Sequence, residues 1–343
     1  MNRIDVIKRI FGSRLELVKS DVIVNNKRVG TMNGCLKFIE DDNDSSETFD
    51  RQWQEFPTLR HDDENNNRIK NVLIHRTGWD LKKLKGKLIL ECGSGAGADS
   101  DVLINHEASL VSVDLSTNIL EKNQSSDKQV IIQASIDDLP FEKNIFDVVF
   151  CHRVIMHTKS PQLTLEHILE FVKPGGSVFI HSYARNFAQM ANWKYFLRPL
   201  TKRMNKNLLF YLINKFGPFL MKLNSLIRSI PPDKFGKFLF KISNRIIPIR
   251  NYHLDSNSSL ANYNHKEILV REGQKIKKNS EEYINALKYN LSVFQKIFRK
   301  PVEIALHPSS DILLYKKKFP SFKITQGHTG EKIYSSSVVF FTK

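Results

Sequence analysis

The sequence feature that most constrains the fold is a glycine-rich turn that follows an apolar run beginning at Leu88. The apolar run predicts a buried strand, and Gly93, Gly95 and Gly97 then allow positive φ angles and a close approach of a ligand to the backbone. A helix that begins directly after such a turn offers unpaired N–H groups and a partial positive charge. The stretch therefore predicts a site for a nucleotide-like ligand, and the turn alone fits more than one class of such ligands.

Strand-like and helix-like segments alternate after this turn. Apolar runs at 109–114, 129–134, 146–151 and 177–183 predict strands, and the spacing of apolar residues over 162–172 predicts a helix. Such an alternation is typical of an α/β fold with a parallel sheet. Asp114 ends the second strand about 20 residues beyond the first glycine, where a carboxylate can accept hydrogen bonds from ribose hydroxyls.

Five short motifs occur in a fixed order between residues 81 and 183. They are Glu-x-Gly-x-Gly-x-Gly from Glu91, Val-Asp-Leu-Ser from Val113, Leu-Pro-Phe from Leu139, Phe-Asp-Val-Val from Phe146 and Lys-Pro-Gly-Gly from Lys173. This ordered set resembles the class I S-adenosylmethionine-dependent methyltransferases, and within them the ubiquinone/menaquinone-pathway type. The resemblance implies a doubly wound, Rossmann-like sheet that is mostly parallel with an antiparallel last strand. It also implies S-adenosyl-L-methionine as cofactor and methyl transfer as the reaction.

The resemblance assigns cofactor-binding roles to residues at the ends of the predicted strands. Besides the three glycines, Glu91 would hold the methionine ammonium and Asp114 would accept bonds from the two ribose hydroxyls. Leu115 and Ile136 would enclose the adenine, and Cys151 would complete the set.

Two positions in this predicted cofactor site depart from the family's pattern. Ser135 stands where related sequences carry an acid that receives the adenine amino group, so Asp137 would have to substitute or the bond would be weaker. Arg153 takes the place of a small residue that lets the methionine tail approach.

We expect the chemistry at the carboxyl ends of the fourth and fifth strands, where open α/β sheets place it. His157 matches one histidine of the family's pair, Met156 replacing the other, and we nominate His157 as the catalytic group. The alternatives at these strand ends are His152, His181 and Tyr183, and each could equally have a structural role. No metal site is expected, because the three cysteines are scattered and form no Cys-x-x-Cys pair.

The first 48 residues predict a small β module and an acidic linker. Its strands are expected at 15–18, 22–24 and 35–39, between turn-forming asparagines and glycine. The module resembles the zinc-ribbon-like leader of some related enzymes, but it lacks the metal-binding cysteine pairs. A plain β extension is the alternative.

The enzyme core is expected over residues 49–184. Helices predicted at 49–56 and 66–78 would form either a lid over the cofactor or packing at the domain edge. The remainder, residues 251–343, would complete the sheet on the acceptor side, with a helix at 281–299 and strands at 322–325 and 335–341.

Residues 185–250 interrupt the predicted sheet and carry nearly all of the chain's net charge of +16. This basic segment holds 14 Lys and Arg against a single acid, Asp233, and it mixes cations with leucines and aromatics at helical spacing. Such helices can cap a substrate on their own domain, lie on an anionic membrane that carries a lipid-linked acceptor, or bind nucleic acid. The dense aliphatic residues make nucleic acid the least favoured of the three.

These observations lead to one main prediction of function and two alternatives. The main prediction is a cytoplasmic, or peripherally membrane-associated, methyltransferase that acts on an unidentified acceptor, either a small molecule or glycan or a lipid-linked compound. The first alternative is a catalytically degenerate methyltransferase-like protein that binds a partner through the basic segment. The second is a nicotinamide-dependent oxidoreductase, for which we find no hydride-handling residues. The sequence leaves the oligomeric state open.

Overall fold

The computed structural model describes residues 1–39, 67–116, 126–183, 316–326 and 336–343, together with 204–205 and short stretches between 208 and 239. The chain divides into two compact units, one formed by Met1–Arg185 with Val302–Lys343 and the other by Asn186–Pro301. The first unit contains every helix and strand discussed below.

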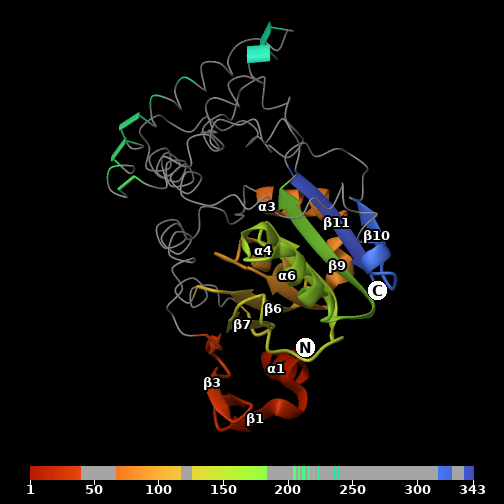
Figure 1. Ribbon diagram of the computed structural model, residues 1–343. Helices are drawn as coiled ribbons and strands as arrows, with labels where there is room; N and C mark the ends of the chain where they lie inside the picture. The colour runs from red at the N-terminus through yellow and green to blue at the C-terminus, as the bar shows by residue number, and fades with distance from the viewer. Residues whose placement is uncertain are drawn as a thin grey trace. The chain divides into compact units, whose positions relative to one another are not determined.

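Helices and strands of the first unit are labelled in Figure 1. The helices are α1 (Arg3–Phe11), α3 (Arg68–Thr77), α4 (Ala98–Asn105) and α6 (Pro161–Leu169), and single helical turns are η1 (Gly12–Arg14), η2 (Leu81–Leu84) and η3 (Ile155–His157). The strands are β1 (Leu15–Val18), β2 (Asp21–Val24), β3 (Lys27–Thr31), β4 (Leu36–Lys37), β5 (Leu88–Cys92), β6 (Ser109–Asp114), β7 (Gln129–Gln133), β8 (Phe146–His152), β9 (Val172–Tyr183), β10 (Lys323–Gln326) and β11 (Ser336–Thr342).

Eight of these strands form one sheet in the order β10-β11-β9-β8-β5-β6-β7-β4. All of its pairs from β9 to β4 are parallel, whereas β11 runs antiparallel to both β9 and β10. The end of the chain is tied back to the turn in β9, because Gly175 N–H donates to the Lys343 carbonyl oxygen. The predicted fold class is confirmed, including the antiparallel last strand and both strands expected near the end of the chain.

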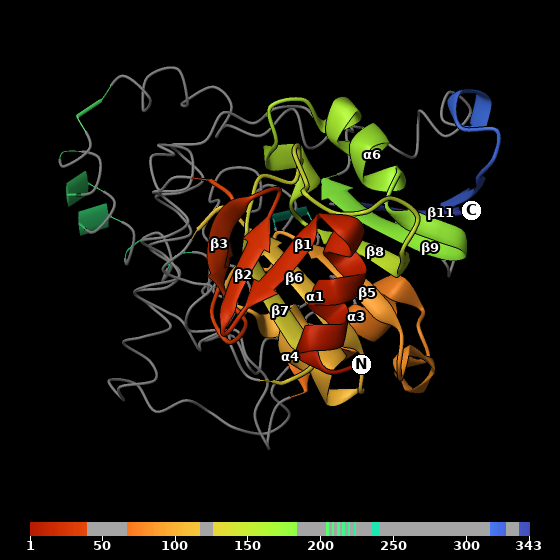
Figure 2. The ribbon, with the colours of Figure 1, turned by 90° about the horizontal axis from the view of Figure 1, so that it is seen from below.

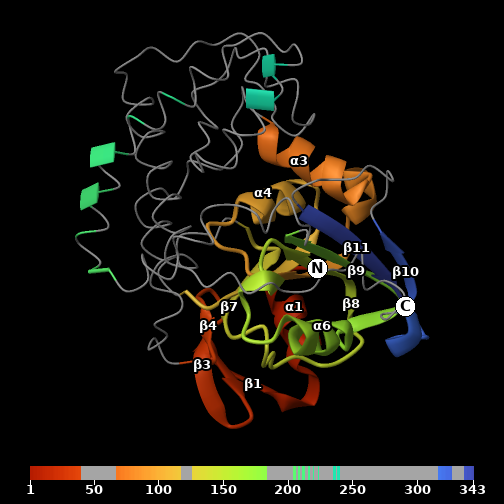
Figure 3. The same ribbon diagram turned by 45° about the horizontal axis from the view of Figure 1, so that its top comes forward.

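The sheet is covered on both faces (Figure 3). On one face, α1 and α6 pack on the strands together with Leu88, Leu90 and Cys92 of β5. On the other face, α3 and α4 pack on the strands together with Ile89 of β5. Because successive side chains of a strand point to opposite faces, strands covered on both sides are buried without a break, and β5, with all five residues buried, shows this directly.

The N-terminal segment differs from the prediction in three respects. Residues 3–11 form α1, a helix that the sequence analysis did not identify, and its apolar side packs against β6 and β7 (Figure 2). A further strand, β3, joins β1 and β2 in a separate three-stranded antiparallel sheet. The strand expected at 35–39 is the short β4, which pairs in parallel with β7 of the large sheet instead of joining the small one.

This arrangement places the described N-terminal residues in the same hydrophobic core as the large sheet. Phe11 is fully buried, and its ring centroid lies 5.6 Å from that of Phe38 and 6.0 Å from that of Phe141. The likeness of this segment to a zinc-ribbon leader stays a prediction, as do the four proposed divisions of the chain.

The other predicted elements fall into two groups. The helix expected at 66–78 is α3, and the helix expected at 162–172 is α6, which ends earlier, at Leu169. The expected turn at 173–176 lies inside β9, where the register with β8 shifts. The helices expected at 49–56 and 281–299, and most of the basic segment, lie outside the described residues.

In the part of the chain that the structure describes, no helix has the length and apolarity needed to span a bilayer.

Candidate functional site

The glycine-rich turn between β5 and α4 has the conformation that its sequence predicts. Gly93, Gly95 and Gly97 have φ angles of 77°, 54° and 81°, which side chains other than glycine rarely adopt. A Cβ atom on Gly93 would lie 2.4 Å from Cγ2 of Val154, so a larger residue could not be accommodated without movement of the loop after β8. The turn thus brings bare backbone to the carboxyl edge of the sheet.

Asp114 connects the end of β6 to this turn. Its Oδ2 accepts a hydrogen bond of 2.8 Å from Gly95 N–H, and its Oδ1 accepts one of 3.1 Å from Ser116 N–H. Since a carboxylate offers about four acceptor positions, these two bonds are compatible with additional bonds to ribose hydroxyls. Asp114 therefore lies beside the glycine turn, as the sequence predicts.

Glu91 lies on the α3/α4 face of the sheet and is buried, with a relative exposure of 2%. Its Oε2 accepts hydrogen bonds from the hydroxyls of Ser100 (2.6 Å) and Ser112 (2.9 Å), and Gln129 Nε2 donates to the Ser112 hydroxyl oxygen. Burial raises the pKa of Glu91 to about 8, and the negative charges of Asp99 and Asp114 add to this effect. Without a nearby cation, Glu91 is therefore mainly protonated at neutral pH.

Two serine hydroxyls beside the turn have no hydrogen-bond partner among the described residues. They are the buried Oγ atoms of Ser94, inside the turn, and of Ser116, two residues beyond Asp114. Unpaired buried hydroxyls are rare, and their position here suits a ligand rich in hydroxyl and charged groups. The residues present thus fit the ribose and methionine parts of S-adenosylmethionine.

The predicted adenine-binding residues lie after β6 and β7. Leu115 and Ser135 are half-buried and Ile136 is buried. Asp137, the proposed substitute for the missing acid, is exposed, and its Oδ1 accepts a hydrogen bond from the Thr164 hydroxyl of α6. This bond ties Asp137 to α6, so the proposed substitution stays a prediction.

The residues around the end of β8 occupy different environments. Cys151 is buried in the core on the α1/α6 face, and burial raises the pKa of its thiol to about 12, so the thiol is neutral and its role in cofactor binding stays a prediction. Arg153 follows β8 in a left-handed conformation, with φ of 64°, and its N–H donates to the His181 carbonyl oxygen. His157 is exposed at the end of η3, and the side chain of Tyr183 lies outside the described set. The structure does not bring His157 into the buried cluster around His152.

That buried cluster has four members, of which the sequence predicted only His152 and His181 as candidates, without a link between them. Arg76 of α3 and Asp99 of α4 hold His152 from two sides, with Arg76 Nη1 2.7 Å from Nε2 and Asp99 Oδ2 2.7 Å from Nδ1. His181 of β9 lies next to His152, with ring centroids 5.0 Å apart. We refer to Arg76, Asp99, His152 and His181 as the histidine cluster.

The hydrogen bonds of His152 define its protonation state. An arginine side chain has only donors, so Nε2 of His152 must accept the hydrogen bond from Arg76. The proton of the neutral ring is therefore on Nδ1, which donates a hydrogen bond to Asp99. Burial lowers the pKa of His152 to about 4, although Asp99 opposes this shift. His152 is therefore a neutral bridge between a cation and an anion.

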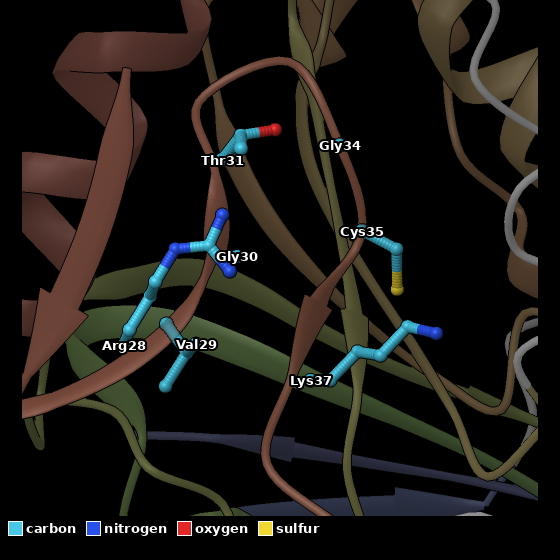
Figure 4. A pocket seen from close by; sticks show the side chains of 7 residues that line it. All are labelled: Arg28, Val29, Gly30, Thr31, Gly34, Cys35 and Lys37. Carbon is cyan, nitrogen blue, oxygen red and sulfur yellow. The ribbon is translucent and has the colours of Figure 1, made fainter. Parts of the chain in front are cut away.

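A separate cavity lies between β3 and β4 and has a volume of about 430 Å³ (Figure 4). Its lining includes Arg28, which pairs with Asp21 at 2.9 Å, and the Cys35 and Lys37 side chains, which point to the same side. None of the lining residues belongs to the predicted cofactor or catalytic set. We therefore place the candidate site at the glycine turn and not at this cavity.

Comparison with known families identifies this same region. Residues 90–180 match the family described as a methyltransferase domain. The match covers the glycine turn, Asp114 and the end of β8, and it confirms the resemblance to class I methyltransferases and S-adenosylmethionine as the expected cofactor of this domain.

Similar curated proteins carry the name ubiquinone biosynthesis O-methyltransferase. The protein from Coxiella burnetii strain RSA 493 is 31% identical over 109 residues, which are 30% of this chain and 47% of the relative. The protein from Paracidovorax citrulli is 29% identical over 123 residues, 32% of this chain and 50% of the relative. The chain thus spans about half the length of the curated relatives that it matches.

Solved structures with some similarity include the N-methyltransferase NodS from Bradyrhizobium japonicum in complex with S-adenosylhomocysteine. It is 16% identical with a TM-score of 0.33, over 42% of this chain and 74% of that one. A methyltransferase from Aquifex aeolicus is also 16% identical with a TM-score of 0.32, over 42% of this chain and 76% of that one.

Proposed function

We propose that this chain is a methyltransferase that moves the methyl group of S-adenosylmethionine to a hydroxyl oxygen of a small-molecule acceptor. The observation that carries the proposal is the glycine turn with three positive φ angles, bonded to Asp114 through Gly95 N–H, inside the matched methyltransferase domain. The oxygen acceptor is suggested by the names of the curated relatives.

Binding of the cofactor follows from the residues at the sheet edge. Asp114 would accept bonds from the ribose hydroxyls, and the glycine turn would lie against the methionine part because it presents backbone without side chains. Glu91 lies at the end of β5 as a buried carboxyl group, so the cofactor's ammonium would find a charge partner there and would favour its ionised form. Leu115 and Ile136 would pack against the adenine.

The cofactor supplies an activated methyl group on a sulfonium, so the protein's contribution to the reaction is mainly geometric. It must align the acceptor with the methyl carbon and keep water out. Buried groups at and just after the end of β8, among them Cys151 and Met156, suit a site from which water is excluded. With its exposed position, His157 is less suited to a proton transfer in such a site, and it stays an untested candidate.

The second unit supports a finer proposal about the acceptor. Its described residues include exposed apolar side chains, namely Leu208, Tyr211, Phe216, Phe219, Phe235 and Phe238. Lys215 Nζ lies 5.5 Å from the centroid of the Tyr211 ring, so cations and aromatics occur together there. Together with the high positive charge of the basic segment, this composition favours contact with an anionic membrane and an acceptor linked to a lipid.

Calorimetric titration with S-adenosylmethionine, S-adenosylhomocysteine and NAD tests the main proposal. We expect both sulfur compounds to bind and NAD not to bind. Binding of NAD alone would instead support an oxidoreductase. Binding of the sulfur compounds without methyl transfer to any hydroxyl acceptor would favour the catalytically degenerate alternative.

A further inference from the structure

The chain makes a tight turn shortly after β7, at residues 135–139, which we call the adenine loop after the role proposed for Ile136. Within it, Asp138 N–H donates to the Ser135 carbonyl oxygen (3.0 Å) and Asp137 N–H donates to the Ser135 hydroxyl (3.2 Å). The two apolar residues of the loop, Ile136 and Leu139, are buried. They share one hydrophobic core with buried residues of α6, the helix that follows β8 in the chain.

Thr164 of α6 makes the first polar contact with the adenine loop. Its hydroxyl is buried and bonds to Asp137 Oδ1, and it also lies 2.9 Å from the Thr158 hydroxyl and 3.0 Å from the Ser160 carbonyl oxygen. A hydroxyl has one proton, and the carboxylate is the strongest acceptor of the three, so Thr164 donates to Asp137. Thr164 therefore links the adenine loop to the residues that follow η3.

His167, three residues further along α6, makes the second contact. Leu139 N–H donates to Nε2 of His167 at 3.1 Å. Because Leu139 is buried, loss of this bond would leave a backbone donor without a partner. Since Nε2 accepts, the neutral ring carries its proton on Nδ1, which faces Glu170 Oε2 at 3.7 Å.

The charged groups near His167 lie on α6, before β8 and in the adenine loop. Glu170 follows the end of α6 and also pairs with Lys143 at 3.1 Å, and the loop contributes the carboxylates of Asp137 and Asp138. On its other side, the imidazole meets the edge of the Phe171 ring, with centroids 5.0 Å apart. Glu170 therefore remains a partner for Nδ1–H whether the ring is neutral or charged.

A proton on Nε2 would remove the second contact. A charged imidazole has donors at both nitrogens and no acceptor, so Nε2–H would face Leu139 N–H and the hydrogen bond would be lost. Histidine is the side chain that ordinarily changes its charge between pH 8 and pH 5. A loop that is not held in the free protein has to be ordered when the ligand binds, and this ordering lowers affinity.

We propose that Thr164 and His167 are positioning residues for the adenine end of the cofactor, and that binding of this end weakens when His167 gains a proton. The inference rests on the proposed binding of S-adenosylmethionine and adds a pH response to it. The two side chains hold the adenine loop from α6, through Asp137 and through Leu139 N–H. Neither of them touches the cofactor in this arrangement.

The probe for this proposal is 5′-methylthioadenosine, which has the adenine and ribose of the cofactor but lacks its amino acid. It has no ammonium group, so its affinity does not depend on an ion pair with Glu91. Titration calorimetry of the full chain at pH 7.5 and at pH 5.5 measures the dissociation constant. We expect the affinity to fall about fivefold at the lower pH, the effect of losing one hydrogen bond.

Two substitutions of His167 separate the acceptor from the proton. His167→Gln keeps an acceptor that does not titrate, so it should bind the probe like the unchanged chain at pH 7.5 and equally well at pH 5.5. His167→Leu has no acceptor and should bind about fivefold more weakly at both pH values. A role in stability alone would leave the pH profile of binding unchanged.

A second pair tests Thr164, and a distant histidine is the control. Thr164→Val keeps the shape without the hydroxyl and should bind the probe about fivefold more weakly, whereas Thr164→Ser keeps the hydroxyl and should bind like the unchanged chain. His106→Gln changes a half-buried histidine just before β6, at the opposite edge of the sheet, and should keep both the affinity and its pH profile.

The outcomes separate this inference from the proposed function. Equal affinities and equal pH profiles in all variants would overturn the positioning role of α6 and leave the methyltransferase proposal intact. Binding by His167→Gln as weak as that by His167→Leu would overturn the role of Nε2 as an acceptor. Failure of the unchanged chain to bind S-adenosylhomocysteine and 5′-methylthioadenosine would overturn the methyltransferase proposal itself.

Discussion

The two faces of the large sheet are equally buried but chemically different. On the α1/α6 face, the strands present apolar side chains, such as Leu90 of β5 and Val111 and Val113 of β6. On the α3/α4 face, strands of the same sheet present buried polar groups, among them Glu91, Ser112, Gln129, Gln133, His152 and His181. Since burying polar groups costs free energy unless each is paired, we expect the first face to serve mainly stability and the second to serve binding.

The largest expected effect comes from breaking the apolar face. Phe11→Ala removes a fully buried ring that contacts Phe38 and Phe141, and we expect the free energy of unfolding to fall by ~3–5 kcal/mol. Chemical denaturation measures this change. An effect below 1 kcal/mol would show that the N-terminal segment folds apart from the sheet.

A smaller effect, on cofactor affinity, is expected at Asp114, at the carboxyl end of β6. Asp114→Ala should weaken binding of S-adenosylmethionine by ~1.5–3 kcal/mol, because it removes bonds between a charged group and the ligand. Calorimetry measures the dissociation constant, and Asp114→Asn, which keeps one acceptor oxygen, is the matched control. An unchanged constant in Asp114→Ala would mean that the ligand site is elsewhere.

Glu91→Gln sharpens the comparison, because it should stabilise the polar face while it weakens function. The pKa of Glu91 is about 8 in the folded chain, compared with 4.5 ordinarily, so between these values the folded state retains a proton that the unfolded state has lost. The free energy of unfolding therefore falls as pH rises through this window. A glutamine keeps the acceptor for Ser100 and Ser112 without this penalty, so at pH 9 we expect the variant to be more stable by ~1–2 kcal/mol.

Denaturation of Glu91→Gln and of the unchanged chain at pH 6 and at pH 9 measures this effect. The stability advantage of the variant should be clearly larger at pH 9 than at pH 6, and cofactor affinity should be lower in the variant because the ammonium loses its charged partner. A variant that is less stable at both pH values would contradict the buried, protonated state of Glu91.

The smallest expected effect concerns the basic segment. Each cation near an anionic membrane contributes ~1 kcal/mol, an effect that salt screens within a Debye length. Removing the charges of Lys202, Arg203 and Lys206 together should reduce sedimentation with anionic liposomes at low salt, without changing stability or cofactor affinity. Equal sedimentation with anionic and neutral liposomes would favour a cap over a soluble substrate.

The sequence was most informative where structure depends on neighbouring residues. The glycine turn, the strand ends and the position of Asp114 are set by motifs of a few residues, so their arrangement could be predicted. α1 was not predicted, although its apolar positions Val6, Ile7 and Ile10 have helical spacing, because the segment is short and charged residues interrupt these positions. The strand at 35–39 was assigned to the small sheet because it follows the strands predicted at 15–18 and 22–24 closely, whereas the β7 residue paired with Leu36, Ile132, is distant in sequence.

The histidine cluster illustrates a different limit. Its contacts join Arg76, Asp99 and His152, which lie on three separate elements, and no local pattern connects them. The sequence could indicate only that His152 and His181 stand at strand ends. Which histidine is held and which is unpartnered depends on how α3 and α4 pack on the sheet.

The pairing of β4 with β7 also bears on self-association of the chain. β7 presents the buried run Gln129–Gln133, and without β4 its outer row of N–H and C=O groups would be open to a strand from another copy. β4 occupies that position with two residues, and the exposed Lys37 gives the new edge a charge that disfavours further strand addition. The N-terminal segment thus covers an edge strand that could otherwise pair with another chain. We expect a shortened chain that lacks residues 1–39 to expose the unpaired backbone groups of β7 and to aggregate more readily.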